Sequence, residues 1–373
     1  MNRQSGMEDQ HYLTSQVITY LGNKRALLDF ITPALEEVQE DLGRDRLYIG
    51  DLFSGSGVVS RYFKQYSEHL IVNDLERYCE VLNQCYLHNR SELDMPRLKQ
   101  IYADLCLRLE EGPLEEGIIS RIYAPRDANN IQPGERVFYT PRNARYIDTA
   151  RRLIGQLDEA DQPFFLAPLL TEASVHNNTS GVFKGFYKNA HTGIGQFGGT
   201  GRNALARICG PIALPFPVFS RFDCPVTICR GDALAVARDL DMLDLVYLDP
   251  PYNQHPYGSN YFMLNLVCDY EEPTELSAVA GIPRTWNRSV YNRACEAFDA
   301  LSELCASIKA RYLLLSFNSE GFITKEQMTG MLARLGSVFV MEKPYNAFRA
   351  SRNLQNRSLH TTEYLFLVKK NLP

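Results

Sequence analysis

The segment Asp249-Pro250-Pro251-Tyr252 has the residue types best suited to chemistry, because it fixes a carboxylate beside an aromatic ring. It follows the apolar run 245–248, which predicts a buried strand. Each proline restricts its own backbone and that of the preceding residue, so covalent geometry holds the carboxylate and the ring. Open α/β sheets bind ligands at the carboxyl ends of strands. The segment therefore predicts a pre-organised site, with an ordinary surface turn as the alternative.

A glycine turn follows the first predicted strand and opens a helix. Its residues are Asp51, Phe53, Ser54, Gly55, Ser56 and Gly57, in the sequence DLFSGSG. Glycines let the backbone approach a ligand closely, and a helix start presents free N–H groups. Ser60 replaces the third glycine of the dinucleotide fingerprint and no Walker lysine follows, which disfavours those two sites. Packing of a helix on the sheet is the alternative role of the turn.

Two further segments place polar groups near the ends of predicted elements. Asp74 ends the second predicted strand, where a carboxylate can accept both ribose hydroxyls of a nucleoside. Capping of the following helix is an alternative for Asp74 and is compatible with binding. Tyr20 and Lys24 precede an apolar stretch near the N-terminus, a pattern that by itself fits a solvated helix start.

Strand-like and helix-like segments alternate in two separate parts of the chain. The first part holds such segments at 46–51, 57–66, 69–74 and 76–90, and the second runs from 226 to 370. Between them lie two predicted helices, at 146–157 and 163–173, and then a glycine-rich, acid-poor stretch. We expect an α/β fold in which residues 1–100 and 216–373 form a Rossmann-like sheet domain. A mainly helical domain, residues 101–215, is inserted into it.

Composition places bounds on the class of protein. The chain has 373 residues, of which 45% are hydrophobic and 22% charged, which excludes disordered and fibrous proteins. The charge sum, 39 − 44 = −5, disfavours a uniformly basic coat, so a site for a polyanion must be confined to one face. The nine cysteines are scattered without a Cys-x-x-Cys spacing, which predicts reduced thiols and no metal site. No apolar leader or membrane-spanning run is apparent, so we expect a cytoplasmic protein.

The order of the motifs resembles one enzyme family. Tyr20-x-Gly-Asn-Lys24, Asp51-x-Phe53-x-Gly55-x-Gly57, Asn73-Asp74, a long insertion, Gly231-Asp232-Ala233 and Asp249-Pro-Pro-Tyr252 are similar to the Dam-like, or alpha, group of adenine-N6 DNA methyltransferases. A looser similarity to bacterial and phage restriction-modification methyltransferases continues through residues 253–262, 316–321 and 362–368. The insertion is longer than in Dam and differs in sequence, so Dam's own target does not transfer.

The resemblance implies an S-adenosylmethionine-dependent methyltransferase that modifies adenine N6 in double-stranded DNA after flipping the base. The cofactor-binding residues that it implies are Tyr20, Lys24, Asp51, Phe53, Ser54, Gly55, Ser56, Gly57, Asp74, Leu75, Asp232, Ala233 and Asp249. The catalytic residues that it implies are Asp249, Pro250, Pro251 and Tyr252. The Asp249 carboxylate and the Pro250 carbonyl would accept the two amino N–H bonds, and Tyr252 would stack on the base.

Two stretches without acidic residues are candidates for DNA contact, with a solvated surface as the alternative. The first, 179–210, contains Lys184, Lys188, Arg202 and Arg207. The second, 343–362, contains Lys343, Arg349, Arg352 and Arg357. Tyr261 could line the pocket for the flipped base or be an ordinary core aromatic. Double-stranded DNA is the expected partner, and a cognate restriction endonuclease is a further one.

The sequence also allows other functions. A cytosine-N4 DNA methyltransferase or an RNA adenine-N6 methyltransferase could use the same acidic turn to activate a planar amine. A catalytically silent nucleic-acid-binding module is disfavoured by the intact Asp249 to Tyr252 turn. A nicotinamide-dependent oxidoreductase is disfavoured by the incomplete glycine fingerprint.

Overall fold

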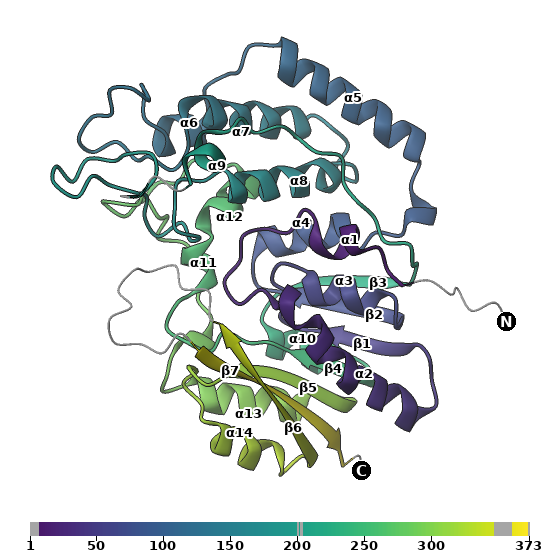
Figure 1. Ribbon diagram of the computed structural model, residues 1–373. Coiled ribbons are helices and arrows are strands. Elements are labelled where there is room, and N and C mark those ends of the chain that lie inside the picture. The colour runs from purple at the N-terminus through teal and green to yellow at the C-terminus, as the bar shows by residue number, and fades with distance from the viewer. Residues whose placement is uncertain (1–6, 200, 202–203, 347–359, 372–373) are drawn as a thin grey trace.

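A sheet of seven strands forms the centre of the molecule, in the order β3-β2-β1-β4-β5-β7-β6 (Figure 1). The strands are β1 (Leu47–Asp51), β2 (Ser67–Asp74), β3 (Val226–Arg230), β4 (Leu243–Leu248), β5 (Ala310–Asn318), β6 (Gly336–Asn346) and β7 (His360–Lys370). The first five strands are parallel, and β7 is antiparallel to both of its neighbours. The computed structural model describes residues 7–199, 201, 204–346 and 360–371. The predicted α/β sheet is confirmed.

The apolar run before Asp249 explains its central position. All six residues of β4 are buried. Leu245 and Tyr247 pack on one face of the sheet, and Val246 and Leu248 pack on the other. A strand that is covered on both faces needs a continuous apolar sequence rather than an alternating one. Because β4 lies between β1 and β5, its end carries Asp249 to the middle of the carboxyl edge.

Helices cover both faces of this sheet. One face packs against α1 (Gln10–Thr14), α2 (Leu28–Leu42), α3 (Val58–Lys64) and α4 (Arg77–Tyr86). The other face packs against α10 (Ala233–Asp239), α13 (Ala297–Ser307) and α14 (Lys325–Leu332). The short helices near the carboxyl edge are η1 (Lys24–Leu27), α11 (Tyr257–Asn260), α12 (Phe262–Asp269) and η3 (Val290–Asn292), and η2 (Arg90–Glu92) follows α4.

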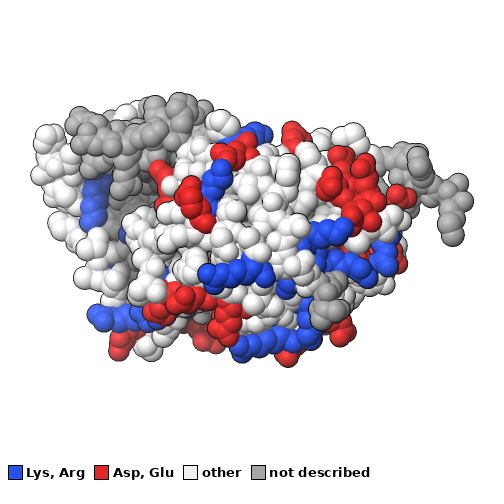
Figure 2. Space-filling view, turned by 90° about the horizontal axis from the view of Figure 1, so that it is seen from below, with Lys and Arg blue, Asp and Glu red and all other residues white. Residues whose placement is uncertain are grey.

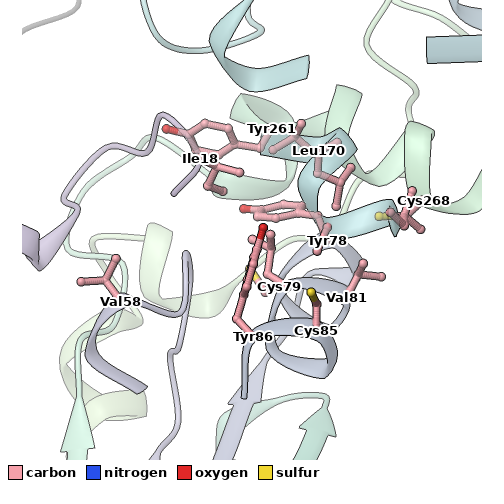
Figure 3. Packing of buried hydrophobic residues seen from close by; sticks show 14 of the residues in the cluster. Ile18, Val58, Tyr78, Cys79, Val81, Cys85, Tyr86, Leu170, Tyr261 and Cys268 are labelled. Carbon is pink, nitrogen blue, oxygen red and sulfur yellow. The ribbon is translucent and has the colours of Figure 1, made fainter. Parts of the chain in front are cut away.

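The inserted segment is helical and packs directly on the sheet domain. Its helices are α5 (Met95–Glu111), α6 (Ile118–Tyr123), α7 (Pro141–Ile154), α8 (Gln162–Val175) and α9 (Leu205–Cys209). Most of α8 is apolar on all sides and buried, as expected for a helix enclosed by protein. Figure 3 shows Leu170 of α8 and Cys268 of α12 beside Tyr78 and Val81 of α4. The insertion and one face of the sheet therefore share one core.

The structure corrects some element boundaries. The expected division between residues 100 and 101 falls inside α5, which begins after Asp94. The Asp94 side chain accepts a hydrogen bond from the Arg97 N–H, and Pro96 occupies the first turn, so both helix-start signals lie before 101. No element was expected between 253 and 293, where the structure contains α11, α12 and η3. The division of the chain into two domains stays a prediction.

The surface charge is mixed on the face seen in Figure 2, where acidic and basic side chains are interspersed. The net charge of −5 is therefore not concentrated in one acidic region of that face. Within the described ranges, the helices are too short or too polar to cross a membrane.

Candidate active site

A pocket opens at the carboxyl edge of the sheet, near the ends of β1, β2 and β4. β1 is followed by α3 and β2, whereas β4 leads to β5 on its other side. Connections that leave adjacent strands in opposite directions create the crevice where open α/β sheets bind ligands. The predicted site residues that line this pocket are Tyr20, Lys24, Asp51, Phe53, Ser54, Gly55, Ser56, Asp74, Leu75, Asp232, Ala233, Asp249 and Pro251. Gly57, Pro250 and Tyr252 do not line it.

The glycine turn forms the floor of the pocket between β1 and α3. Gly55 has a φ of 52°, and a Cβ added to it would lie 2.9 Å from the Tyr20 ring. Both the backbone conformation and the close approach therefore require glycine. Gly57, with a φ of 77°, is the N-cap of α3, so it shapes the turn without facing the pocket. Ser54 joins the turn to β2, because its N–H donates to the Asn73 carbonyl at 3.0 Å.

Asp74 lines the pocket and also accepts hydrogen bonds from two backbone N–H groups. One carboxylate oxygen accepts the Gly55 N–H at 2.8 Å, and the other accepts the Glu76 N–H at 3.0 Å. Asp74 thus holds the glycine turn and the start of α4 together while it lines the pocket with Leu75. Burial raises the pKa of Asp74, although these backbone donors lower it.

Asp232 and Phe53 line the same pocket from β3 and β1. Asp232 is the N-cap of α10, and one of its oxygens accepts the N–H groups of Leu234 and Ala235, both at 3.1 Å. The Phe53 ring meets the Tyr291 ring edge to face, with centroids 5.2 Å apart. Aromatic and acidic walls of this kind suit a ligand with a flat ring and hydroxyl groups.

Asp51 is a buried carboxyl group at the end of β1. One of its oxygens accepts the Ser60 hydroxyl at 2.6 Å, and the other, Oδ1, is buried without a hydrogen-bond partner. Burial raises the pKa of Asp51 to about 7, against the lowering effect of the Ser60 hydroxyl. An unpaired acceptor in a pocket wall favours a ligand that brings a hydrogen-bond donor or a positive charge.

The Asp249 to Tyr252 turn lies beside the pocket at the end of β4. The Asp249 side chain is 18% exposed, and burial raises its pKa to about 6, against the lowering effect of the Lys24 ammonium. Its Oδ1 atom is buried beside the Lys24 ammonium. The Tyr252 ring packs edge to face on Phe317, and the Tyr252 carbonyl accepts the Phe322 N–H at 3.0 Å. The turn is therefore held at both ends.

Lys24 reaches this turn from η1, at the far end of the chain. Its ammonium lies 3.4 Å from Asp249 Oδ1 and 3.2 Å from Glu363 Oε2 on β7, and Lys24 is only 4% exposed. Burial disfavours the charged ammonium, but the two carboxylates raise the pKa of Lys24 well above its usual value. The contribution of Glu363 was not expected from the sequence.

Two tyrosine residues hold the Tyr20 loop in place. Tyr20 stacks on Tyr257 and Tyr261, with centroids 4.9 and 4.8 Å apart. The Leu21 N–H donates to the Tyr261 hydroxyl at 2.7 Å, and the Tyr257 hydroxyl donates to the Leu21 carbonyl at 3.0 Å. Tyr261 has 0% exposure, which favours the core alternative over a contact with DNA. Figure 3 shows Tyr261 within this packed region.

Sequence reasoning missed the segment that covers the other side of the pocket. The lining includes Asn287, Arg288, Ser289, Tyr291 and Asn292, which precede α13. The Asn287 side chain donates to Glu76 Oε2 at 3.1 Å, which attaches the segment to the start of α4. No motif in the sequence marks these residues, because their place depends on a contact 211 positions away in the chain.

The basic residues expected to contact DNA divide into four groups. Lys184 and Lys188 are exposed, and Lys188 lies over the Phe186 ring at 5.2 Å. The Arg207 guanidinium donates to the Val175 and Asn177 carbonyls at the end of α8, so it caps that helix, and its contact with phosphate stays a prediction. Lys343 on β6 is half-buried, with its ammonium 5.8 Å from the centre of the Phe30 ring. Arg202, Arg349, Arg352 and Arg357 lie outside the described residues.

The fold and the pocket define the class of protein. The strand order, with its antiparallel seventh strand, and the pocket at the carboxyl edge are those of a Rossmann-like methyltransferase. Residues 20–194 and 225–331 match the family model of D12 class N6 adenine-specific DNA methyltransferases, and the chain belongs to this family. Across the described ranges, no group of three or more His, Cys, Asp or Glu could hold a metal ion.

Curated relatives extend this result to the length of the chain. The type II methyltransferase M.NlaIII of Neisseria lactamica is 29% identical over 95% of this chain and 99% of its own length. M.CviAII of Paramecium bursaria Chlorella virus 1 is 28% identical over 94% of this chain and 98% of its own length. M.FokI of Planomicrobium okeanokoites is 25% identical over 95% of this chain but only 53% of its own length. The similarity therefore includes the inserted helices.

Proposed function

We propose that the protein is a site-specific DNA methyltransferase that transfers a methyl group from S-adenosylmethionine to adenine N6 in double-stranded DNA. Membership of the D12 class family supports the reaction. The observation that carries the proposal at the level of residues is Asp249: a half-buried carboxylate that lines the pocket and is paired with the Lys24 ammonium. A carboxylate held in a pocket wall in this way can accept the N–H of an incoming amine.

The pocket residues fit S-adenosylmethionine by their chemistry. Asp74 and Asp232 each keep acceptor capacity for ribose hydroxyls or ring nitrogens, since their oxygens can accept more than one hydrogen bond. Phe53 and Tyr291 offer apolar surface for a flat ring. The unpaired Oδ1 of Asp51 suits a cationic amino group. When bound, the cofactor supplies a methyl group on a positively charged sulfur.

Asp249 and its neighbours would prepare the target amine for attack. The lone pair of adenine N6 is delocalised into the ring, which makes the amine a weak nucleophile. If the Asp249 carboxylate and the Pro250 carbonyl accept its two N–H bonds, the nitrogen is drawn toward tetrahedral geometry and its lone pair becomes localised and available to the methyl group. Hydrogen bonds to an ionised carboxylate are the stronger ones, and fixed acceptors need no rearrangement during the reaction.

The surplus proton of the methylated amine would pass to Asp249. The pKa of Asp249, about 6, leaves the group mainly ionised at neutral pH yet able to accept a proton transiently. Lys24 remains an ammonium because its pKa lies well above neutrality, so it stabilises the carboxylate and cannot itself accept this proton. The protonated Asp249 then releases this proton to solvent.

The flipped base would be held by Tyr252 and the duplex by the inserted segment. A base that leaves the stack loses a few kcal/mol, and stacking on an aromatic ring recovers about 1 to 3 kcal/mol. Exposed Lys184 and Lys188 support phosphate contact. The type II relatives support a restriction-modification role, in which the proposed cellular partner is an endonuclease that cuts the unmethylated site. A protein that acts on genomic DNA in a bacterial or phage-infected cell works in the cytoplasm.

One labelling experiment tests the proposal. The protein is incubated with S-adenosylmethionine that carries a labelled methyl group and with unmethylated genomic DNA, and the DNA is digested to nucleosides. We expect the label in N6-methyladenosine. Asp249→Ala should lower the turnover number by at least about a hundredfold, because one fixed hydrogen-bond partner of the reacting group is lost. Binding of S-adenosylmethionine to the same variant, measured by calorimetry, should change much less.

The matched control is Asp239→Asn, an exposed carboxylate at the end of α10. This variant should retain wild-type turnover. Label in 4-methylcytosine, in RNA but not in DNA, or in no nucleoside would contradict the proposed function. Equal loss of activity in both variants would contradict the role of Asp249.

A further inference from the structure

Lys24 makes two unequal contacts with the carboxylates beside it. Its ammonium donates a hydrogen bond to Glu363 Oε2 at 3.2 Å. The same ammonium is 3.4 Å from Asp249 Oδ1, which is buried and within ion-pair distance. Glu363 is 5% exposed and Lys24 is 4% exposed, so water does not compete for this cation. Lys24 is therefore shared between two carboxylates, and its shorter contact is the one with Glu363.

We propose that Glu363 is a positioning residue for methyl transfer, which anchors the Lys24 ammonium so that Asp249 shares this cation and its carboxylate stays available to the target amine. This inference rests on the proposed function of Asp249. Lys24 then acts on Asp249 chiefly through its charge. Glu363 contacts no substrate in this arrangement and works through Lys24.

The physical reason lies in how a buried cation is stabilised. A desolvated ammonium must be paired and hydrogen-bonded. If Asp249 were its single counterion, Lys24 would pair more closely with Asp249 and compete with the amine for that carboxylate. A second carboxylate on the opposite side removes that requirement. β7 supplies it because its register places Glu363 opposite Asn318 of β5, next to the Asp249 turn.

Other ionisable groups also face Asp249 and must be separated from Glu363 in any test. Those with an electrostatic interaction with Asp249 are Lys24 on η1, Asp51 on β1, Tyr247 on β4, Tyr252 in the turn, Tyr257 on α11 and Glu363 on β7. The tyrosines stay neutral, since burial raises the pKa of each of them. Asp51 titrates near 7 and is affected by Asp249 and Asp74, and Glu363 is not among the groups that shift it.

The test compares Glu363→Gln with Glu342→Gln, an exposed residue on the neighbouring strand β6. Both changes remove one negative charge and preserve side-chain shape. In Glu363→Gln we expect turnover at neutral pH to fall about tenfold, the effect of losing a hydrogen bond to a charged group. The acidic limb of the turnover profile should move to lower pH, because Glu363 raises the pKa of Asp249. Glu342→Gln should match the wild type in both properties.

A measurement without DNA or cofactor gives an independent result. Carbon-13 NMR of aspartate-labelled protein follows the titration of Asp249, whose resonance is identified by its loss in Asp249→Asn. The pKa of Asp249 should be lower in Glu363→Gln than in the wild type. If the wild type transfers no methyl group, the proposed function fails, yet this titration still decides whether Glu363 controls the environment of Asp249.

A second variant covers the case in which Glu363→Gln does not fold. Glu363→Asp keeps the counter-charge but withdraws it from Lys24 by one methylene group, so turnover should fall while the acidic limb stays near that of the wild type. Unchanged turnover in a folded Glu363 variant would overturn the proposal. A lowered melting temperature with unchanged turnover and unchanged Asp249 pKa would show a structural role only and would also overturn it.

Discussion

The carboxyl edge of the sheet and the glycine-rich stretch of the inserted segment hold their charged groups in opposite ways. At the sheet edge, Lys24 is 4% exposed and Asp51 is 1% exposed, and burial shifts the pKa of Asp51 and of Asp249. In the inserted stretch, Lys184 and Lys188 are exposed to solvent. Salt screens the electrostatic interactions of buried charges only slightly, whereas it weakens those of exposed charges.

This difference shows how one chain can combine methyl transfer with DNA binding. A reacting amine needs acceptors that are fixed and dry before it arrives, and the sheet edge provides them through strand ends and rigid turns. A duplex needs cations that can adapt to phosphates along its surface, and an exposed loop provides those. Variants of the sheet edge should therefore change turnover at any salt concentration, and variants of the inserted stretch should change binding in a salt-dependent way.

The largest effect that sharpens the comparison is expected at Tyr252. Tyr252→Ala should lower kcat/KM for DNA by about 10- to 100-fold, because stacking of the flipped base is worth about 1 to 3 kcal/mol. Tyr252→Phe keeps the ring and should stay close to the wild type. Steady-state kinetics at two salt concentrations measure both variants. If Phe were as damaging as Ala, the hydroxyl rather than the ring would be the important group.

The pH dependence of turnover tests the role of the buried Asp249 carboxylate. Below about pH 6, turnover at saturating substrate should fall about tenfold per pH unit, because protonated Asp249 can no longer accept as a carboxylate. The sign follows from the raised pKa: the active, ionised form dominates above it and is lost as the pH falls through it. Turnover measured across the acidic range checks this. An acidic limb near 7 that disappears in Asp51→Asn would assign the limb to Asp51 instead.

Tyr261→Phe tests whether this residue belongs to the core rather than to the DNA interface. The change leaves the Leu21 N–H without its acceptor, which should lower the free energy of unfolding by about 1 to 3 kcal/mol. Denaturant unfolding measures the loss, with the half-exposed Tyr48→Phe as the control. Unchanged stability together with weaker DNA binding would restore the original expectation of a DNA contact.

The smallest effects are expected for Lys184→Gln and Lys188→Gln. Each should reduce the salt dependence of DNA binding by about one unit of slope and leave turnover at saturating DNA unchanged. Fluorescence anisotropy with a labelled duplex over a range of salt concentrations measures the slope. Lys99→Gln, an exposed change on α5, is the control. A slope that is the same in all four proteins would remove these lysines from the interface.

Much of the sheet and of the pocket could be predicted because the signals are local. The apolar run of β4 and the two prolines after it placed Asp249 at a strand end, and the glycine turn placed Gly55 beside it. Boundaries of the insertion were less accurate, since α5 begins before residue 101. Residues 287–292 carried no signal, because a loop without a motif reaches the pocket only when it packs on Glu76.

The sequence by itself determined where the rigid turns and strand ends occur, since proline, glycine and apolar periodicity act within a few residues. Only the tertiary structure decided which distant groups meet there. Lys24 and Glu363 are 339 positions apart, and they touch because the antiparallel strand β7 lies beside β5. Tyr261 is buried because it stacks against Tyr20, which belongs to a segment near the N-terminus. The role of a charged group or an aromatic ring depends on the residues that pack around it and exclude water. Those residues come from segments far apart in the chain.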